Sequence, residues 1–165
     1  MLDGAADARL GHVASLLAGR PATVHCWSER GWRALVRRIH TPDAAGVTQI
    51  ATRRIDLSPA VCEVLHQIKR IARQDLWLDP AFALVALAHE SQHAAGYANE
   101  AVAECRGLQL VAREAALLGV PRSFGEDFAI EYWLDAYQYL PRRYRSSECR
   151  NGGRLDLRPH SNVWP

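Results

Sequence analysis

The sequence predicts an α+β fold that is mainly helical, and three observations lead to this prediction. Residues 21–57 hold short stretches rich in β-branched and aromatic residues, which indicate a small mixed or antiparallel sheet near the N-terminus. Residues 58–140 carry apolar stripes at helical spacing between proline and glycine breaks, so we expect a helical core there. Residues 141–165 are rich in Gly, Pro and Asn without periodicity, which predicts an irregular C-terminal tail.

Length and composition fit a single globular domain over residues 1–165. Of the 165 residues, 48% are hydrophobic and 23% are charged, which allows a buried core and argues against disorder. A formal net charge of +2 without a basic block argues against a nucleic-acid partner. The chain has no apolar run of about 18 residues or more, so we expect no membrane span.

The N-terminal third is expected to combine one helix with the strands of the sheet. Residues 5–19 show apolar side chains at helical spacing, and the pattern stops at Gly19 and Pro21. Residues 32–39 fit either a strand or a short helix, and we favour a strand. The other expected segments are strands at 23–27, 47–51 and 53–57 and a turn at 28–31, giving a sheet of three or four strands.

Capping residues and helix breakers predict four helices after the sheet. The second helix should end near Gly96, which can adopt the left-handed conformation that closes a helix. The third should run without interruption to about Leu118, and the fourth should stop before Pro141. The four start signals are Ser58-Pro59, Asp79-Pro80, Asn99, and the capping box Ser123-Phe124-Gly125-Glu126.

The four cysteines, Cys26, Cys62, Cys105 and Cys149, are widely spaced and include no CxxC pair, so they do not predict a structural zinc site. An even number allows two disulfides in an exported protein or buried free thiols in a cytoplasmic one. We favour disulfides and an exported, extracellular protein, because a tether would stabilise the irregular tail that contains Cys149. The opening residues do not resemble a signal peptide.

An HExxH motif, His89-Glu90-Ser91-Gln92-His93, ends the apolar run 81–88. Residues four apart lie on one face of a helix, so His89 and His93 can hold the same metal ion. Glu90 lies beside that face, where a carboxylate can take a proton from a metal-bound water. Two histidines and a glutamate are costly on so apolar a helix, so we favour a metal site over ordinary core or surface residues.

A catalytic zinc usually has three protein ligands, so a third ligand is needed. The metzincin spacing HExxHxxGxxH fails here, because Asn99 stands at its last position and Met1 is the only methionine for a methionine turn. Glu100 and Glu104 come next, one helical turn apart, and we favour Glu100 as the ligand over Glu104. Glu100 would also complement the dipole at the start of its helix, whether or not it binds metal.

The HExxH motif followed by Asn99-Glu100 and Glu104 resembles the gluzincins, the thermolysin-like zinc peptidases, over about residues 81–118. The link between His93 and Glu100 is shorter than in thermolysin and is similar to that of small, compact gluzincin-like peptidases.

This resemblance implies a zincin-like fold that holds one Zn²⁺ per chain through His89, His93 and Glu100. Glu104 would then orient a ligand histidine. The resemblance also implies a metallopeptidase, and specifically an endopeptidase, that hydrolyses a peptide or protein substrate with Glu90 as general base. An edge of the small sheet would pair with the substrate.

Peptide hydrolysis also needs a hydrogen-bond donor for its tetrahedral intermediate. Our main candidates are Tyr97, Tyr132 and Tyr137, with a preference for a tyrosine within 130–144, although these aromatic residues also fit core packing. Tyr139, Tyr144, His160 and Arg106 are further possible donors. The alternative function is a zinc-stabilised or metal-free protein-interaction domain that keeps the helix pair without catalysis.

Overall fold

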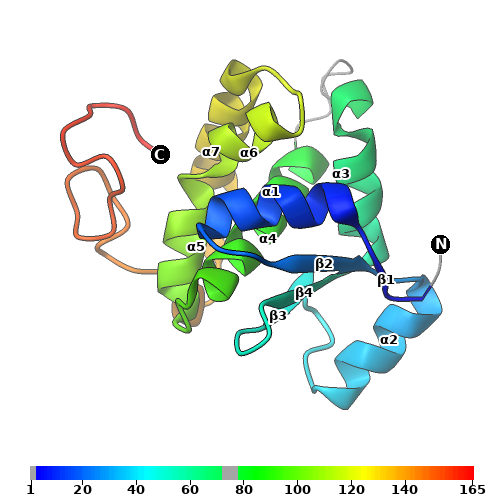
Figure 1. The fold of residues 1–165 in the computed structure, drawn as a ribbon. Helices are drawn as coiled ribbons and strands as arrows, with labels where there is room; N and C mark the ends of the chain where they lie inside the picture. The colour runs from blue at the N-terminus through cyan, green and yellow to red at the C-terminus, as the bar shows by residue number, and fades with distance from the viewer. Residues whose placement is uncertain (1–2, 72–77) are drawn as a thin grey trace.

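A computed structural model describes residues 3–71 and 78–165, which form a mainly helical α+β fold with a small four-stranded sheet (Figure 1). The predicted fold class is therefore confirmed at this level. The elements are β1 (Ala5–Ala6), α1 (Ala8–Ala18), β2 (Thr23–Cys26), α2 (Glu29–Arg38), β3 (Gly46–Gln49), β4 (Arg54–Leu57), α3 (Pro59–Ile71), α4 (Leu78–Ala95), α5 (Glu100–Leu108), α6 (Val111–Leu117) and α7 (Arg122–Asp135), followed by two 3₁₀ helices, Tyr137–Tyr139 and Arg142–Tyr144.

The sheet is mixed and has the strand order β1-β2-β4-β3. Its central strands β2 and β4 run parallel, with Val24 opposite Ile55 and Cys26 opposite Leu57. The edge strands β1 and β3 each pair antiparallel with their single neighbour. Three strands lie within the predicted region 21–57, and the fourth, β1, precedes it. Because side chains alternate along a strand, Val24, Cys26, Ile55 and Leu57 all enter the main core from one face.

Residues 32–39, predicted as a strand, belong instead to helix α2, so this prediction is wrong. The expected turn at 28–31 is in fact the helix start, where the Ser28 hydroxyl accepts a hydrogen bond from the Gly31 amide at 3.1 Å. Trp32, Leu35 and Val36 are spaced as one helical face and form a second, smaller apolar cluster. This spacing outweighs the β propensity of the individual residues.

The helix predicted over residues 5–19 is shorter than expected. Asp7 caps α1 by accepting the Leu10 amide at 2.8 Å, and residues 5–6 before it pair with β2 as a strand. The helix ends as predicted at Gly19, which has a φ of 69°. The predicted start of α3 is also confirmed, since the Ser58 hydroxyl accepts the Val61 amide at 3.3 Å.

The long helix predicted from residue 99 to 118 is wrong, because the chain turns between α5 and α6. The Gln109 side chain lies at this turn, where its amide nitrogen donates to the Leu155 carbonyl at 2.9 Å and its oxygen accepts the Leu157 amide at 2.7 Å. The turn thus holds the C-terminal tail against the helices. The capping box at 123–126 does not form either, because α7 already begins at Arg122, which pairs with Glu126.

Helix α4 is the centre of the main core and packs against α1, α3, α5, α7 and the sheet (Figure 1). It matches the predicted HExxH helix, and Gly96, with a φ of 109°, follows its end. The predicted start, Asp79-Pro80, lies just inside the helix, which begins at Leu78. Among the described residues, no helix combines the length and apolar character needed to cross a bilayer.

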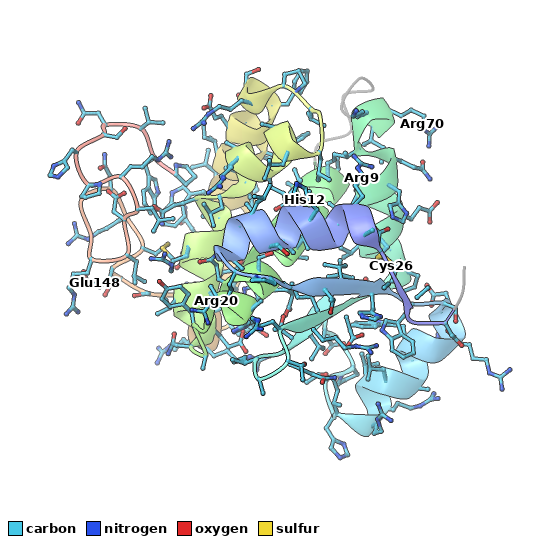
Figure 2. All side chains as sticks on the ribbon, viewed as in Figure 1. Arg9, His12, Arg20, Cys26, Arg70 and Glu148 are labelled. Atoms are coloured by element: carbon cyan, nitrogen blue, oxygen red, sulfur yellow. A yellow bond between two sulfur atoms is a disulfide. The ribbon has the colours of Figure 1, made fainter. Side chains whose placement is uncertain are left out.

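Two disulfides connect segments that are distant in the chain. Cys26–Cys62 joins the end of β2 to α3, and Cys105–Cys149 joins α5 to the irregular tail (Figure 2). The expected tether of the tail is therefore present. The tail otherwise lacks helices and strands apart from the 3₁₀ helix at 142–144, in agreement with the prediction.

Candidate metal centre

The HExxH residues lie in the interior of the molecule, near the end of α4. The side chains of His89, Glu90 and His93 are all buried, with residue exposures of 7%, 6% and 8%. Their helical spacing places the two imidazoles side by side, with ring centroids 4.7 Å apart. After Gly96 the chain reverses, and the Asn99 side chain caps α5 by accepting the Val102 amide at 3.0 Å. This short reversal returns Glu100 to the two histidines.

Three donor atoms converge at one point. The Nε2 atoms of His89 and His93 are 3.0 Å apart, and Oε2 of Glu100 lies 3.1 Å and 3.3 Å from them respectively. The point in their plane that is equidistant from all three lies about 1.8 Å from each, close to zinc bond lengths of about 2.0–2.2 Å. His89, His93 and Glu100 could therefore hold a zinc-sized ion together.

The other ring nitrogens determine which tautomers the two histidines adopt. Nδ1 of His93 lies 2.6 Å from the Tyr97 carbonyl oxygen, which can only accept a hydrogen bond, so this nitrogen carries the proton. Nδ1 of His89 lies 2.6 Å from Oε2 of Glu104 and donates to it. In the neutral rings both Nε2 lone pairs consequently point towards each other and towards the Glu100 carboxylate.

Three lone-pair donors in contact repel one another unless a positive charge lies between them. A proton can supply this charge: burial lowers the pKa of His89, but its hydrogen bonds to Glu100 and Glu104 outweigh burial and raise the pKa to about 10. The same hydrogen bonds from His89 and His93 lower the pKa of Glu100. A divalent cation can supply the charge equally well, and the donor set of two imidazoles and a carboxylate suits zinc.

Glu104 occupies a different place from Glu100. It is buried, with 5% exposure, and both of its oxygens are engaged: Oε2 accepts from His89, and Oε1 accepts the Tyr132 hydroxyl at 2.6 Å. Glu104 thus fixes the His89 ring from the side opposite the three converging atoms. The structure brings both predicted glutamates to the histidines, but only Glu100 belongs to the triangle of donor atoms.

Glu90 lies beside the triangle and contacts the edge strand β3. The Thr48 hydroxyl is 2.6 Å from Oε2 of Glu90 and 3.0 Å from its main-chain carbonyl oxygen. A side chain at Gly46 would come within 2.7 Å of Cγ of Glu90, so this glycine leaves the space that the glutamate fills. Burial raises the pKa of the Glu90 carboxyl, although the neighbouring His89 and the Thr48 hydrogen bond oppose this shift.

The three tyrosines predicted as donors lie in different surroundings. Tyr132 is buried and uses its hydroxyl to hold Glu104, while the hydroxyl of Tyr137 accepts the Ser146 amide at 3.0 Å. Tyr97 is exposed, and its ring is covered by the Arg106 guanidinium at 4.2 Å. The ring centroid of Tyr144, one of the further possible donors, lies 6.0 Å from that of His89.

A close helix crossing sets the position of the two glutamates. A β-carbon at Gly107 of α5 would lie 2.8 Å from the His89 amide nitrogen, so the backbones of α4 and α5 touch at this point. Arg106, the residue before it, donates to the Gln92 side-chain oxygen at 3.1 Å. Gln92 itself is buried and donates to the Leu17 carbonyl of α1. These contacts hold α5 against the HExxH helix.

Sequence reasoning did not identify Thr48 or Gly107 as parts of this site, and it named Tyr144 only among the further possible donors. Thr48 and Tyr144 lie 42 and 55 positions from their partners in the chain, and neither stands in a motif. Gly107 carried a usable signal, since a glycine inside a helix lowers helix stability and indicates a close approach of another backbone.

Comparisons of the chain with models of protein families, with curated proteins and with solved structures found no match. The resemblance to gluzincins therefore remains a prediction that depends on the motif and its spacing.

Proposed function

We propose that the protein is a zinc-dependent metallopeptidase with a zincin-like fold and a compact gluzincin-like site. The observation that carries this proposal is the convergence of three donor atoms, Nε2 of His89, Nε2 of His93 and Oε2 of Glu100. These atoms lie 3.0–3.3 Å from one another. Both Nδ1 atoms already donate to other groups, so the arrangement is suited to a cation. Zinc bound there would lower the pKa of a bound water and polarise a peptide carbonyl.

In this proposal Glu100 is the third ligand and Glu104 positions His89. Glu104 cannot serve as a ligand without giving up its contact to Nδ1 of His89, because its other oxygen already accepts the Tyr132 hydroxyl. Glu100, in contrast, places a single oxygen, Oε2, beside the Nε2 atoms of both histidines.

Glu90 acts as the general base. Its carboxylate takes the proton of the attacking water and passes it to the leaving amine nitrogen. Thr48 donates to the same carboxylate at 2.6 Å, which fixes its orientation beside the two histidines. Burial favours the neutral acid and so makes the ionised group a stronger base.

The substrate is a peptide or protein segment. The edge strand β3 pairs only with β4 and also supplies Thr48 to Glu90, so a substrate strand added to β3 would lie along the reacting groups. Tyr144 is the donor we favour for the tetrahedral intermediate, because its ring centroid lies 6.0 Å from that of His89. Two cysteine pairs at bonding distance agree with an oxidising, extracellular location.

The test compares the metal content and the peptidase activity of five chains. We expect the wild-type protein to hold about one zinc per chain and to cleave a mixed peptide library detected by mass spectrometry. Glu90→Gln should keep the zinc and lose cleavage, whereas His93→Ala and Glu100→Ala should each lose both. His12→Ala, on the exposed face of α1, is the control and should match the wild type.

Three outcomes would contradict the proposal. Zinc retained at one per chain in both His93→Ala and Glu100→Ala would show that these residues are not the ligands. Zinc lost in both variants, with no peptide cleaved by the wild-type protein, would favour a zinc-stabilised interaction domain instead. Cleavage that survives in Glu90→Gln would remove the general-base role.

A further inference from the structure

We propose that the Cys26–Cys62 pair is also half of a second metal site, which binds a zinc-like divalent cation when the two cysteines are reduced. The other two ligands are His66 of α3 and Asp7, which precedes α1. This site shares no residue with the HExxH cluster, so it does not depend on the peptidase proposal.

The four side chains already lie together. The Cys26 sulfur, a ring nitrogen of His66 and a carboxylate oxygen of Asp7 lie within 4.8 Å of one another. Cys62 is bonded to Cys26, so its sulfur is at the same place. Three different segments therefore bring four ligand groups close to one point.

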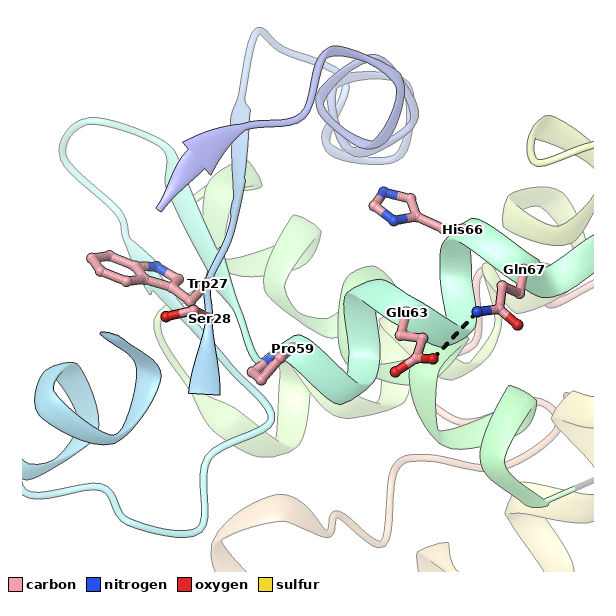
Figure 3. Close-up of a pocket in the computed structure, with 6 residues that line it drawn as sticks. All are labelled: Trp27, Ser28, Pro59, Glu63, His66 and Gln67. Carbon is pink, nitrogen blue, oxygen red and sulfur yellow. Dashed lines mark hydrogen bonds between the residues drawn. The ribbon is translucent and has the colours of Figure 1, made fainter. Parts of the chain in front are cut away.

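The positions of Cys62, His66 and Asp7 leave a ligand atom of each residue available for a metal ion. Cys62 and His66 are four residues apart on α3, so they share one face, as the two histidines of α4 do. Asp7 uses Oδ1 to cap α1 and places Oδ2 2.6 Å from Nε2 of His66. Figure 3 shows the His66 ring directed from α3 towards the segment that carries β1 and α1.

The chemistry explains why the site depends on the redox state. Two thiolates, an imidazole and a carboxylate form a tetrahedral donor set that zinc prefers, whereas disulfide sulfurs carry no charge and bind zinc poorly. Binding to the reduced pair releases the two thiol protons to the solvent. Oxidation by a small disulfide such as glutathione disulfide forms the Cys26–Cys62 bond, yields two molecules of the reduced thiol after uptake of two protons, and releases the metal ion.

An ion can approach this point from the surface. The two sulfurs are buried, but the His66 side chain is 36% exposed. A cavity of about 330 Å³ opens beside the imidazole and is lined by Trp27, Ser28, Pro59, Glu63, His66 and Gln67 (Figure 3). Within the described ranges, the other pair, Cys105–Cys149, has no comparable group of ligands around it.

Both forms of this site join the same two elements. The disulfide connects β2 to α3, and a metal held by Cys26, Cys62 and His66 would connect them as well. The inference is therefore that β2 stays fixed to α3 in a reducing environment, where the disulfide is absent, provided that a suitable cation is present.

Cobalt(II) is a suitable probe, because thiolate ligands give it an intense charge-transfer absorption that histidine and carboxylate ligands do not. The experiment uses the full chain with Cys105→Ser and Cys149→Ser, prepared reduced and without oxygen, so that Cys26 and Cys62 are the only thiols. We expect one cobalt per chain with this absorption and its loss after glutathione disulfide is added. Cobalt at the HExxH cluster does not contribute to this signal.

Three matched variants test the remaining ligands in the same background. His66→Ala and Asp7→Asn should each lower cobalt affinity at least about tenfold, because each removes a direct ligand. Asparagine at position 7 still caps α1, so this variant separates metal binding from helix stability. His12→Ala should have no effect. Circular dichroism confirms that each reduced chain is folded before titration.

The proposal is overturned if the folded, reduced chain shows no thiolate-to-cobalt absorption. It is also overturned if both His66→Ala and Asp7→Asn bind cobalt as tightly as the parent chain, because the two thiols would then be acting without the proposed partners.

Discussion

The carboxylate of Glu104 connects His89 to Tyr132. Its Oε2 lies 2.6 Å from Nδ1 of the histidine, and its Oε1 accepts a hydrogen bond from the tyrosine hydroxyl at 2.6 Å. Because the carboxylate holds the proton on Nδ1, the lone pair of Nε2 is directed at Glu100 and His93. The orientation of the candidate metal centre thus depends on a residue that does not belong to the triangle of donor atoms.

Glu104→Gln is therefore expected to weaken zinc binding by about 10–100-fold, because the neutral amide holds the His89 tautomer less firmly. Competition with a zinc-binding dye measures this change. Tyr132→Phe is the comparison, since it removes only the hydroxyl on the far side of the carboxylate and should weaken binding less. Equal zinc affinity in Glu104→Gln and the wild type would show that Glu104 does not position His89.

Thr48→Val should lower kcat/KM of peptide cleavage about tenfold or more while the zinc content stays the same. Valine keeps the size of the side chain but removes the hydroxyl that donates to the Glu90 carboxylate. Thr52→Val is a matched control, because the Thr52 hydroxyl bonds only to Gln49 at the surface. A drop of the same size in the control would assign the effect to the sheet edge in general.

Tyr144→Phe should lower kcat with little change in KM if its hydroxyl stabilises the tetrahedral intermediate, because that contact forms only during the reaction. Tyr139→Phe serves as control, since its side chain belongs to a residue that is 81% exposed. Steady-state kinetics on one cleaved peptide separates the two constants. An unchanged kcat in Tyr144→Phe would exclude this tyrosine as the donor.

Glu114 should make the protein less stable as the pH rises. The residue has 0% exposure, and within the described part of the chain neither of its carboxylate oxygens has a hydrogen-bond partner. Burial raises its pKa well above 4.5, so the folded state keeps a proton that the unfolded chain releases above about pH 4.5. The stabilising contribution is therefore complete below the unfolded pKa and is lost as the pH rises towards the folded pKa.

In this pH range the unfolding free energy should fall by up to about 1.4 kcal/mol per pH unit because of this single group. Glu114→Gln cannot ionise, so its stability relative to the wild type should increase with pH. Urea unfolding at several pH values from about 4 to 8 measures the difference. Glu63→Gln, at an exposed position of α3, should show a constant difference; a constant difference for Glu114→Gln as well would contradict the prediction.

The disulfides can be tested by counting thiols. The unfolded chain should release no free thiol unless a reductant is present, because all four cysteines are paired. Replacing Cys105 and Cys149 by serine should lower the unfolding free energy by about 4 kcal/mol. This is the free-energy equivalent of the conformational entropy that a disulfide closing a loop of this length removes from the unfolded chain. Free thiols in protein purified from an oxidising compartment would contradict the pairing.

The sequence predicted the parts of the fold that depend on neighbouring residues. Caps at Ser58 and Asn99 and the helix end at Gly19 follow from local chemistry, and each is found in the structure. The HExxH geometry is equally local, since it needs only one helical turn. The strand prediction at 32–39 failed because the helical spacing of Trp32, Leu35 and Val36, which buries all three on one face, outweighs the β propensity of the individual residues.

Contacts between distant segments could not be predicted in the same way. The turn after α5 is joined to the tail by the Gln109 side chain, which bonds to Leu155 and Leu157, more than 40 positions away. Thr48 reaches Glu90 only because β3 is the sheet edge that faces α4. Such contacts depend on the whole topology, and a single sequence carries no direct signal for them.

The contact at Gly107 has a consequence for any screen of this protein. The backbones of α4 and α5 can approach this closely because Gly107 has no side chain. Even one added methyl group would clash with the His89 backbone. Alanine at this position would move Glu100 and Glu104 outward together without changing any polar atom of the centre. A mutagenesis programme restricted to charged and polar residues would thus pass over one of the positions least able to accept a substitution.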